Sequence, residues 1–353
     1  MIKPIAFYLP QFHPIPENDA WWGKNFTEWH NVRHAVPQFE GHYQPHVPHN
    51  TIGYYDLRDR NFLIKQHSIA KKFGIYGFCY YYYFFNGKTL LETPLKIIRN
   101  TPQIETKYCL CWANENWTRA WYGQNKEVLI SNCHGEENAL SFIKTIAPYF
   151  LDDRYIKIDD KPLLLVYEPD LIDDIHSYVD IWRDYSKQLG FKGIYLALVE
   201  ALTLGTNPSD LNFDAAVEFA PDWTKTHLLT KTTDSHRIFD YKETVKNMLL
   251  KPEPPYQRFS CVFPSWDNTP RYKRSAITFI NSNPGIFKFF LQHVIERTRN
   301  TIPSDRQFVF INAWNEWGEG CHLEPDVRHG YTYLQIIREV LNPAGPLVSG
   351  RQL

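Results

Sequence analysis

The chain has 353 residues, and its 38 Lys and Arg residues nearly balance 39 Asp and Glu residues, giving a formal net charge of −1. This balance leaves no electrostatic footprint for nucleic acid or an anionic membrane surface, so a neutral substrate fits better. No stretch approaches the roughly 18 apolar residues of a membrane span, and the N-terminus lacks the long apolar region of a signal peptide. The chain as given is therefore expected in the cytoplasm, or in the periplasm if a leader has been removed.

Eight short, mostly apolar segments have the composition of buried strands and are separated by helical or long segments. In chain order they are Ile5–Leu9, Ile75–Tyr82, Lys107–Trp112, Pro162–Tyr167, Ile194–Val199, Ala215–Phe219, Cys261–Phe263 and Phe308–Ile311. Strands that are buried on both faces and joined in this way are typical of a parallel sheet. The sequence predicts an α/β fold, with one domain over residues 1–353 that is a (β/α)₈ TIM barrel with long βα loops at its C-terminal face.

Five helices are predicted from apolar spacing and terminal signals. They are Arg60–Phe73, Glu136–Tyr149, Ile175–Leu189, a helix that begins at Pro284 and carries an apolar stripe through Ile295, and Tyr331–Leu341. The six cysteines show neither metal-ligand nor disulfide spacing. Those that fall in predicted strands are expected to be reduced core residues, namely Cys79, Cys109, Cys111 and Cys261. No metal or cofactor is predicted.

A long irregular segment, Pro10–Asp59, follows the first strand and is rich in His, Pro and Trp. Loops of this length in compact domains are usually functional or disordered, and the aromatic content argues against disorder. We expect the segment to fold over the barrel mouth and to supply part of a binding site through its stacking faces and hydrogen-bonding tips. The residues of interest are Gln11, His13, Trp21, Trp22, Trp29 and His46.

Polar and aromatic side chains also follow the other strands, where chemistry gathers in barrels of this kind. Aromatic rings can stack on the apolar faces of sugars, while amides and carboxylates bind the hydroxyls. For any single aromatic residue, core packing remains the alternative interpretation. The candidate substrate-binding residues at strand ends are Tyr81, Tyr83, Trp112, Asn114, Glu115, Trp117, Arg119, Tyr167, Glu218, Trp266 and Asp267.

The last predicted strand runs directly into a polar cluster that contains Glu316 and Glu319. One helical turn would bring these two side chains to one side, with Cβ atoms about 5–6 Å apart, and Gly318 and Gly320 permit such a turn. Two carboxyls at that separation cannot both ionise freely, so one should keep a proton and act as a donor, as glycosidic bond cleavage requires. A solvated turn with capping glutamates is the alternative. The neighbours predicted to bind substrate are Asn312, Trp314, Asn315 and Trp317.

These segments resemble the WbsX-type proteins of bacterial surface-polysaccharide clusters, which are relatives of glycoside hydrolase family 99. The motifs that carry the resemblance are Tyr8-Leu-Pro-Gln-Phe-His13, Asn25-Phe-Thr-Glu-Trp29, Gly77-Phe-Cys-Tyr-Tyr-Tyr-Tyr83, Cys111-Trp-Ala-Asn-Glu-Asn-Trp-Thr118, Trp266-Asp-Asn-Thr269 and Asn312-Ala-Trp-Asn-Glu-Trp-Gly-Glu-Gly320. Together they span nearly the whole chain.

The resemblance implies a (β/α)₈ barrel and retaining cleavage of an α-glycosidic, mannoside-like bond without a metal. By this resemblance, Glu319 would be the general acid and base, and Glu316 would assist attack by the 2-hydroxyl of the sugar to give an anhydro-sugar intermediate. The usual enzyme nucleophile of retaining glycosidases is then absent.

Two other functions stay open. WbsX-type proteins are often described as glycosyltransferases, so transfer or transglycosylation in O-antigen or capsular polysaccharide synthesis is one alternative. The chain contains neither Asp-x-Asp nor G-x-G-x-x-G, which weighs against a nucleotide-sugar donor. The other alternative is an inactive carbohydrate-binding barrel. Under each of these interpretations the partner is an oligosaccharide or polysaccharide, and the sequence does not determine an oligomeric state.

Overall fold

The structure is a computed structural model that describes residues 1–119, 124–201, 205–231, 236–272 and 274–342. Nine parallel strands form a nearly closed barrel in the order β13-β10-β9-β8-β4-β2-β1-β16-β14. They are β1 Lys3–Tyr8, β2 Gly77–Phe85, β4 Lys107–Trp112, β8 Lys161–Val166, β9 Tyr195–Glu200, β10 Ala215–Glu218, β13 Arg258–Phe259, β14 Cys261–Val262 and β16 Phe308–Ile311.

The barrel closes through one segment of chain that pairs with a different neighbour at each end. β13 pairs with β10, and β14 pairs with β16, with only Ser260 between them. β13 and β14 therefore occupy a single position in the barrel, and each of the eight predicted strands is present. The predicted barrel fold is confirmed.

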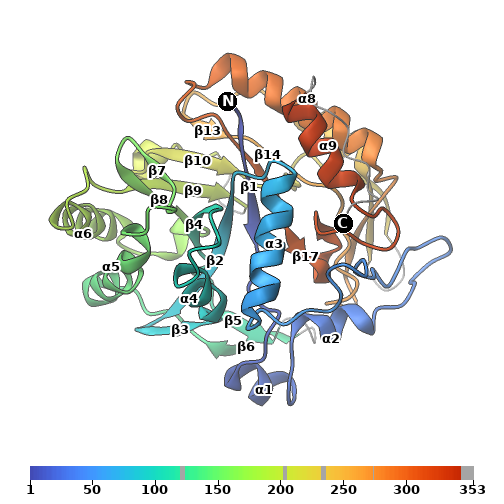
Figure 1. Cartoon of the computed structure of the whole chain (residues 1–353), viewed down its shortest axis with the longest axis horizontal. Coiled ribbons are helices and arrows are strands. Elements are labelled where there is room, and N and C mark those ends of the chain that lie inside the picture. Colours follow the sequence, from blue (N-terminus) through green and yellow to red (C-terminus); the bar gives the residue numbers. More distant parts are fainter. Residues whose placement is uncertain (120–123, 202–204, 232–235, 273, 343–353) are drawn as a thin grey trace.

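Helices cover the outside of the barrel (Figure 1). They are α3 Arg60–Lys72, α4 Thr93–Arg99, α5 Glu136–Phe150, α6 Ile175–Gln188, α7 Tyr241–Leu249, α8 Pro284–Thr301 and α9 Thr332–Leu341. Where both ends were predicted, they differ from these by at most one residue; α8 begins at the predicted Pro284 and continues past Ile295 to Thr301. The short helices α4 and α7 were not predicted; α7 is fixed at its start by the Asp240 side chain, which accepts a hydrogen bond from the Glu243 amide.

The smaller elements are short strands of two to seven residues and short helices in the connections. They are α1 Pro16–Trp22, α2 Glu28–Arg33, β3 Lys88–Leu90, β5 Trp117–Arg119, β6 Gln124–Ile130, β7 Lys157–Ile158, η2 Pro169–Leu171, η3 Pro208–Leu211, β11 His227–Lys231, β12 Arg237–Asp240, β15 Ile277–Ile280, β17 Asn315–Glu316, η4 Trp317–Glu319 and β18 Cys321–His322. Figure 1 shows α1, α2 and the β5–β6 hairpin at the end of the barrel toward which β1 runs. The segment predicted to be irregular, Pro10–Asp59, thus carries two helices.

Aromatic side chains fill both the inside and the outside of the barrel wall. Inside, the Phe7 ring lies 5.6 Å from the rings of both Tyr81 and Phe310. Outside, Trp112 stacks on Phe142 of α5 at 4.4 Å. The strand cysteines Cys79, Cys109, Cys111 and Cys261 are buried and unpaired, as predicted.

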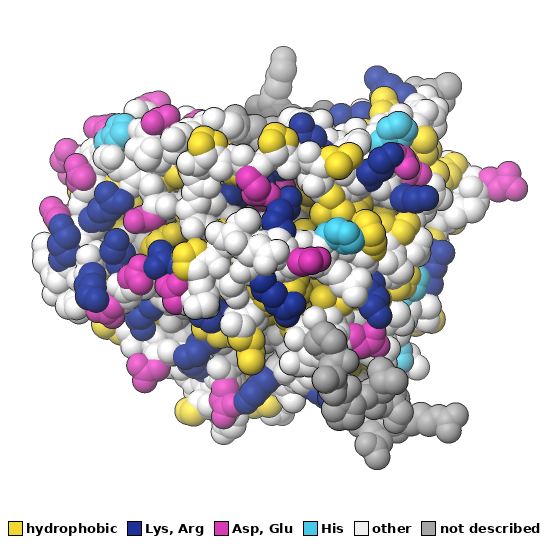
Figure 2. All heavy atoms as spheres, turned by 90° about the horizontal axis from the view of Figure 1, so that it is seen from above, with side chains coloured by type: hydrophobic (Ala, Val, Ile, Leu, Met, Phe, Trp, Pro, Cys, Tyr) yellow, Lys and Arg dark blue, Asp and Glu magenta, His cyan; other side chains and the backbone are white. Residues whose placement is uncertain are grey.

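The surface carries charges of both signs. On the face seen in Figure 2, Lys and Arg side chains are interspersed with Asp and Glu side chains. None of the helices in the described part of the chain combines the length and apolar character needed to cross a membrane.

Candidate active site

A cavity of about 440 Å³ opens at the C-terminal ends of the barrel strands. The site-residue candidates that line it are Gln11, Tyr81, Tyr83, Glu115, Trp117, Tyr167, Trp266, Glu316 and Glu319. Further lining comes from residues that the sequence did not single out for binding, including Asn18, Phe219, Trp223, Asn268, Arg271 and Tyr272. The cavity therefore has acidic, amide and aromatic walls.

The turn that carries the two glutamates is attached to the first strand by an asparagine. The Asn315 side-chain oxygen accepts a hydrogen bond from the Leu9 amide at 2.7 Å, and its nitrogen donates to the Leu9 carbonyl at 2.9 Å. This pair of bonds continues β-type pairing past the end of β1. Glu316 then leads into the 3₁₀ turn η4, which ends at Gly320 in the left-handed conformation with φ of 57°.

Arg271 joins Glu316 and Glu319 to a third carboxylate. Its Nη2 lies 2.7 Å from Glu316 Oε2, its Nη1 lies 2.7 Å from Glu319 Oε1, and its Nε lies 2.9 Å from Glu28 Oε1. The two glutamates of the turn therefore lie on the same side, as the three-residue spacing predicts. Glu28 and Arg271 were not predicted as site residues, although Glu28 belongs to the Asn25–Trp29 motif.

Gly318 is required by the close approach of this cluster. A Cβ atom at position 318 would lie 2.0 Å from Glu28 Oε1 and 2.8 Å from Arg271 Nε. Neither contact is possible without displacement of the ion pair.

Gly318→Ala should therefore lower the free energy of unfolding by about 1–3 kcal/mol, the usual cost of overpacking a well-packed site. Chemical denaturation of the variant and the parent protein measures this difference. Gly285→Ala in α8 is the control, because a Cβ atom there would lie 3.2 Å from its nearest neighbour, the exposed Asn283 side chain, and would meet no ion pair. Equal stability of the two variants would contradict the contact at Gly318.

The electrostatics of the cluster favour a proton on Glu319. Burial raises the pKa of Glu319 to about 8; Arg271 opposes this shift, while the charges of Glu316 and Glu28 add to it. Burial also raises the pKa of Glu316, again opposed by Arg271. Glu319 can thus hold a proton at neutral pH beside a second carboxyl group.

The opposite walls of the cavity are aromatic. The rings of Tyr81 and Tyr167 meet edge to face at 6.0 Å, and those of Trp266 and Trp223 do so at 5.1 Å. Trp117 contacts Tyr83 in the same way at 5.0 Å. Such walls offer both flat apolar faces and polar tips to a ligand.

Four candidates from strand ends are absent from the described lining of the cavity, and each side chain is engaged elsewhere. Trp112 is fully buried against α5 and α6, and Asn114 donates to the Glu168 carbonyl at 2.7 Å. Glu218 forms an ion pair with Lys251 at 2.6 Å. Asn312 donates to the Ala220 carbonyl at 2.8 Å. Because side chains alternate across a strand, residues next to an inward-facing position face the surrounding helices and loops.

Five further candidates are buried and are absent from the described lining of the cavity. Trp29 donates to the Tyr55 carbonyl at 2.8 Å, and Trp317 donates to Glu324 at 2.7 Å. Trp314 packs on Phe78 at a ring distance of 5.0 Å. The Asn315 side chain is hydrogen-bonded to the backbone of Leu9, and His13 is 1% exposed. The Arg119 side chain falls outside the part of the chain that the structure describes.

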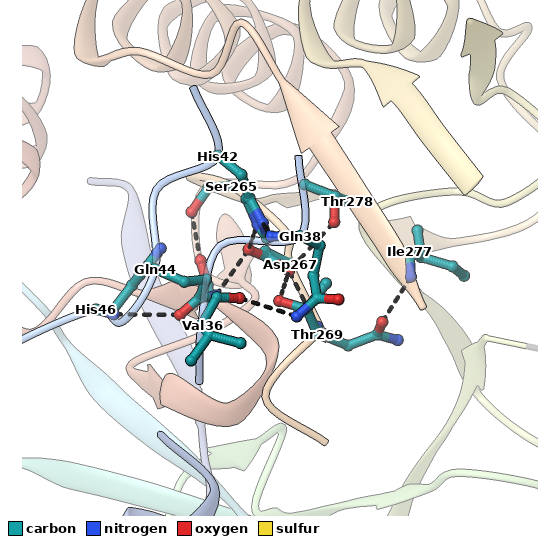
Figure 3. Close-up of polar contacts among 12 residues, drawn as sticks. Val36, Gln38, His42, Gln44, His46, Ser265, Asp267, Thr269, Ile277 and Thr278 are labelled. Carbon is teal, nitrogen blue, oxygen red and sulfur yellow. Dashed lines mark hydrogen bonds and ion pairs between the residues drawn. The ribbon is translucent and has the colours of Figure 1, made fainter. Parts of the chain in front are cut away.

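Asp267 organises the loop after β14 and is absent from the described lining of the main cavity. Figure 3 shows side chains from two distant segments converging on its carboxylate. His42 and Gln44 approach Oδ2 at 2.6 and 2.7 Å, while Thr269 and Thr278 donate to Oδ1. The Asp267 amide donates to the Glu319 carbonyl at 2.6 Å. Asp267 thus ties the N-terminal segment to the loop that carries Arg271 and to the glutamate turn.

The Pro10–Asp59 segment reaches the cavity through fewer residues than predicted. Gln11, Asn18 and Trp22 line it, and Trp21 packs edge to face on Trp117 at 5.7 Å. His46 instead lines a second cavity of about 150 Å³, where its Nδ1 lies 2.9 Å from His322 Nε2. Among the side chains that the structure describes, no group of three or more His, Cys, Asp or Glu residues is arranged to hold a metal ion.

The fold is similar to that of known glycosidases. It matches the structure of the GH99 endo-alpha-mannosidase from Bacteroides thetaiotaomicron with a TM-score of 0.58 and 14% identity, over 96% of each chain. A structure described as a glycoside hydrolase-like protein matches with a TM-score of 0.59 and 14% identity, over 96% of this chain and 93% of that one. At this identity the similarity concerns the fold, which is the α/β barrel of glycoside hydrolases of this type.

The family is shown by sequence. Residues 4–337 match the family model described as Glycosyltransferase WbsX, so the chain belongs to the WbsX family. Two proteins named Uncharacterized protein WxcX, from Xanthomonas campestris pv. campestris strains B100 and ATCC 33913, are 42% and 41% identical to it over 346 residues. These matches cover 96% of this chain and 50% of each relative, so the chain spans about half the length of the curated relatives it matches.

Proposed function

We propose that the protein is a retaining glycoside hydrolase that cleaves an α-linked, mannoside-like bond in a bacterial polysaccharide or glycan. The observation that carries the proposal is the pair Glu316 and Glu319, each 2.7 Å from Arg271, at the aromatic cavity of the barrel mouth. The fold shared with endo-alpha-mannosidases supports the same reaction class.

In the proposed mechanism, Glu319 donates its proton to the leaving oxygen as the glycosidic bond breaks. Glu316 accepts the proton of the sugar 2-hydroxyl, whose oxygen attacks the anomeric carbon and forms an anhydro sugar. Glu319, now ionised, then removes a proton from water as the water oxygen attacks the anomeric carbon. The bond from that carbon to the 2-oxygen breaks, and Glu316 returns the proton it holds to the 2-oxygen. Two successive displacements at the anomeric carbon retain its configuration.

Arg271 and the aromatic walls support these steps. The guanidinium fork fixes the directions of both carboxyl groups, which is the positioning that such a reaction requires. The rings of Tyr81, Trp117 and Trp266 line the cavity, and such rings can stack on the apolar faces of sugars.

Transfer of a sugar to an acceptor other than water is the second candidate function, and the description of the family model favours it. Among the described side chains that line the cavity, Arg271 is the one cation, and it is held by three carboxylates. A pyrophosphate-linked donor would be repelled by this acidic lining, whereas a glycan donor would not. If the protein is a transferase, we therefore expect transglycosylation between glycans.

The test is digestion of α-linked manno-oligosaccharides and bacterial polysaccharides, with the first-formed product anomer determined by NMR. Release of the α-anomer supports the proposal. Products of the β-anomer overturn the retaining mechanism, and turnover that requires a nucleotide sugar overturns the glycosidase assignment.

The pH dependence follows from the proton on Glu319. Because the acid must be protonated to donate, kcat/KM for a substrate with a poor leaving group should fall as the pH rises through about 8. A pH–rate series measures this limb. An aryl glycoside with a good leaving group is the control, since its kcat/KM should fall less over the same pH range. An equal fall for both substrates would contradict the assignment of Glu319 as the acid.

A further inference from the structure

The three carboxylates around Arg271 outnumber its single positive charge. Glu316 and Glu319 take the two terminal nitrogens, and Glu28 takes Nε. Three ionised carboxylates would leave the cluster with an excess of two negative charges in a buried place. One carboxyl group therefore has to hold a proton.

Glu28 occupies the least accessible position of the three. It lies in α2, its side chain is 0% exposed, and its Oε2 accepts no hydrogen bond from the described residues. Its Oε1 lies over Gly318, at the one place in the turn where a side chain would exclude it. Glu28 is absent from the described lining of the cavity, whereas its partner Arg271 and the two glutamates of the turn belong to that lining.

We propose that Glu28 is a positioning residue that neutralises the Arg271 guanidinium and thereby keeps the proton on Glu319. Arg271 has to contact both glutamates of the turn in order to align them. Without a counter-ion, its full positive charge would act on those two carboxyl groups and favour ionisation of both. Glu28 removes this conflict, because it balances the charge from the side that faces away from the substrate.

The other groups that act on Glu319 are consistent with this role. Glu316 and Arg271 are its charged neighbours on the turn and on the loop after β14. Tyr81, Tyr167, Tyr272 and Cys321 face it from β2, from the end of β8, from the loop after β14 and from β18. Burial raises the pKa of each of these four groups, so they stay neutral near neutral pH and do not take over the role of counter-ion.

The experiment is an infrared titration of the protonated Glu319 carboxyl group in the whole chain. Its C=O stretching band is identified by its loss in Glu319→Gln and is followed through the neutral and alkaline range. In Glu28→Gln the midpoint should fall by about one pH unit or more, the size of shift that one neighbouring charge produces in a buried carboxyl group. The alkaline limb of the pH–rate profile should move in the same direction.

Glu218→Gln is the matched control, because Glu218 is also a buried carboxylate in an ion pair with a basic side chain, Lys251, at 2.6 Å. It makes no described contact with Arg271, so its replacement should leave the Glu319 midpoint unchanged. A fall in both variants would show a general packing effect and overturn the proposal. An unchanged or raised midpoint in Glu28→Gln would overturn it as well.

Glu28→Ala keeps the proposal testable if Glu28→Gln does not fold, because it removes the same charge and leaves room for water beside Arg271 Nε. Its midpoint must also fall, and an unchanged midpoint in the folded Ala variant overturns the proposal. The role of Glu28 rests on the proposed function of Glu319 as the proton donor, but the titration needs no substrate. A shifted midpoint in a protein that cleaves no α-glycoside would therefore support the role of Glu28 and reject the proposed function.

Discussion

Replacement of Glu319 by Gln should reduce the turnover of glycosides with poor leaving groups by about 10²- to 10⁴-fold, the usual contribution of general acid–base catalysis. The amide cannot donate a proton of suitable acidity to the leaving oxygen, although its oxygen can still accept a hydrogen bond from Arg271. Substrates with good leaving groups should be partly spared in the bond-breaking step, because they need little protonation. Steady-state kinetics on a matched pair of substrates measures the difference.

Glu115→Gln is the control for this prediction. Glu115 lines the same cavity and forms no described ion pair with Arg271, so its replacement should cost far less. The unfolding midpoints of both variants show whether a loss of activity comes from misfolding. Near-normal cleavage of a poor-leaving-group substrate by Glu319→Gln would remove Glu319 from the acid role.

Replacement of Glu316 by Gln should also cost about 10²- to 10⁴-fold, but irrespective of the leaving group. Its proposed partner is the 2-hydroxyl of the sugar, which has to be activated however easily the bond breaks. For the same reason, 2-deoxy and 2-fluoro substrates should react poorly with the unmodified protein. Kinetics of these substrates, compared with their 2-hydroxy parents, provides the measurement.

Mass spectrometry of the protein after reaction with a 2-fluoro glycoside is an independent test of the attack by the 2-hydroxyl oxygen. No covalent glycosyl-enzyme should form, because the attacking oxygen belongs to the substrate. A stable adduct on Glu115, or near-normal activity of Glu316→Gln, would show that another carboxylate is the nucleophile and that Glu316 belongs to substrate binding.

The strands and the glutamate turn could be predicted from local sequence because their signals are local. Apolar runs such as Phe308–Ile311 mark buried strands, and the spacing of Glu316 and Glu319 needs only one turn to bring them together. Alternation along a strand could also have excluded some candidates. Tyr81 and Tyr83 face the cavity, while Glu218 precedes the inward-facing Phe219 and so points outward.

The remaining parts of the site depend on contacts between distant loops. Arg271 follows the Trp266–Thr269 motif, but its position depends on the five donors that hold Asp267, two of which come from His42 and Gln44. Glu28 reaches Arg271 only because the Pro10–Asp59 segment folds back over the barrel. Neither the position of Arg271 nor its contact with Glu28 follows from a regular spacing of residues, so a single sequence does not reveal them.

Glu28 contacts a residue far along the sequence, so the site can form only after distant parts of the chain have come together. Glu28 and Arg271 are 243 positions apart, and the turn that holds Glu316 and Glu319 is attached to Leu9 across 306 positions. β1 pairs with β16, so a strand early in this sequence receives one of its two partners from a segment far along the chain. The aromatic residues Tyr81, Tyr83 and Trp117 precede the Glu316 and Glu319 pair by a large part of the sequence. The candidate site is complete only when β16 pairs with β1 and the barrel closes.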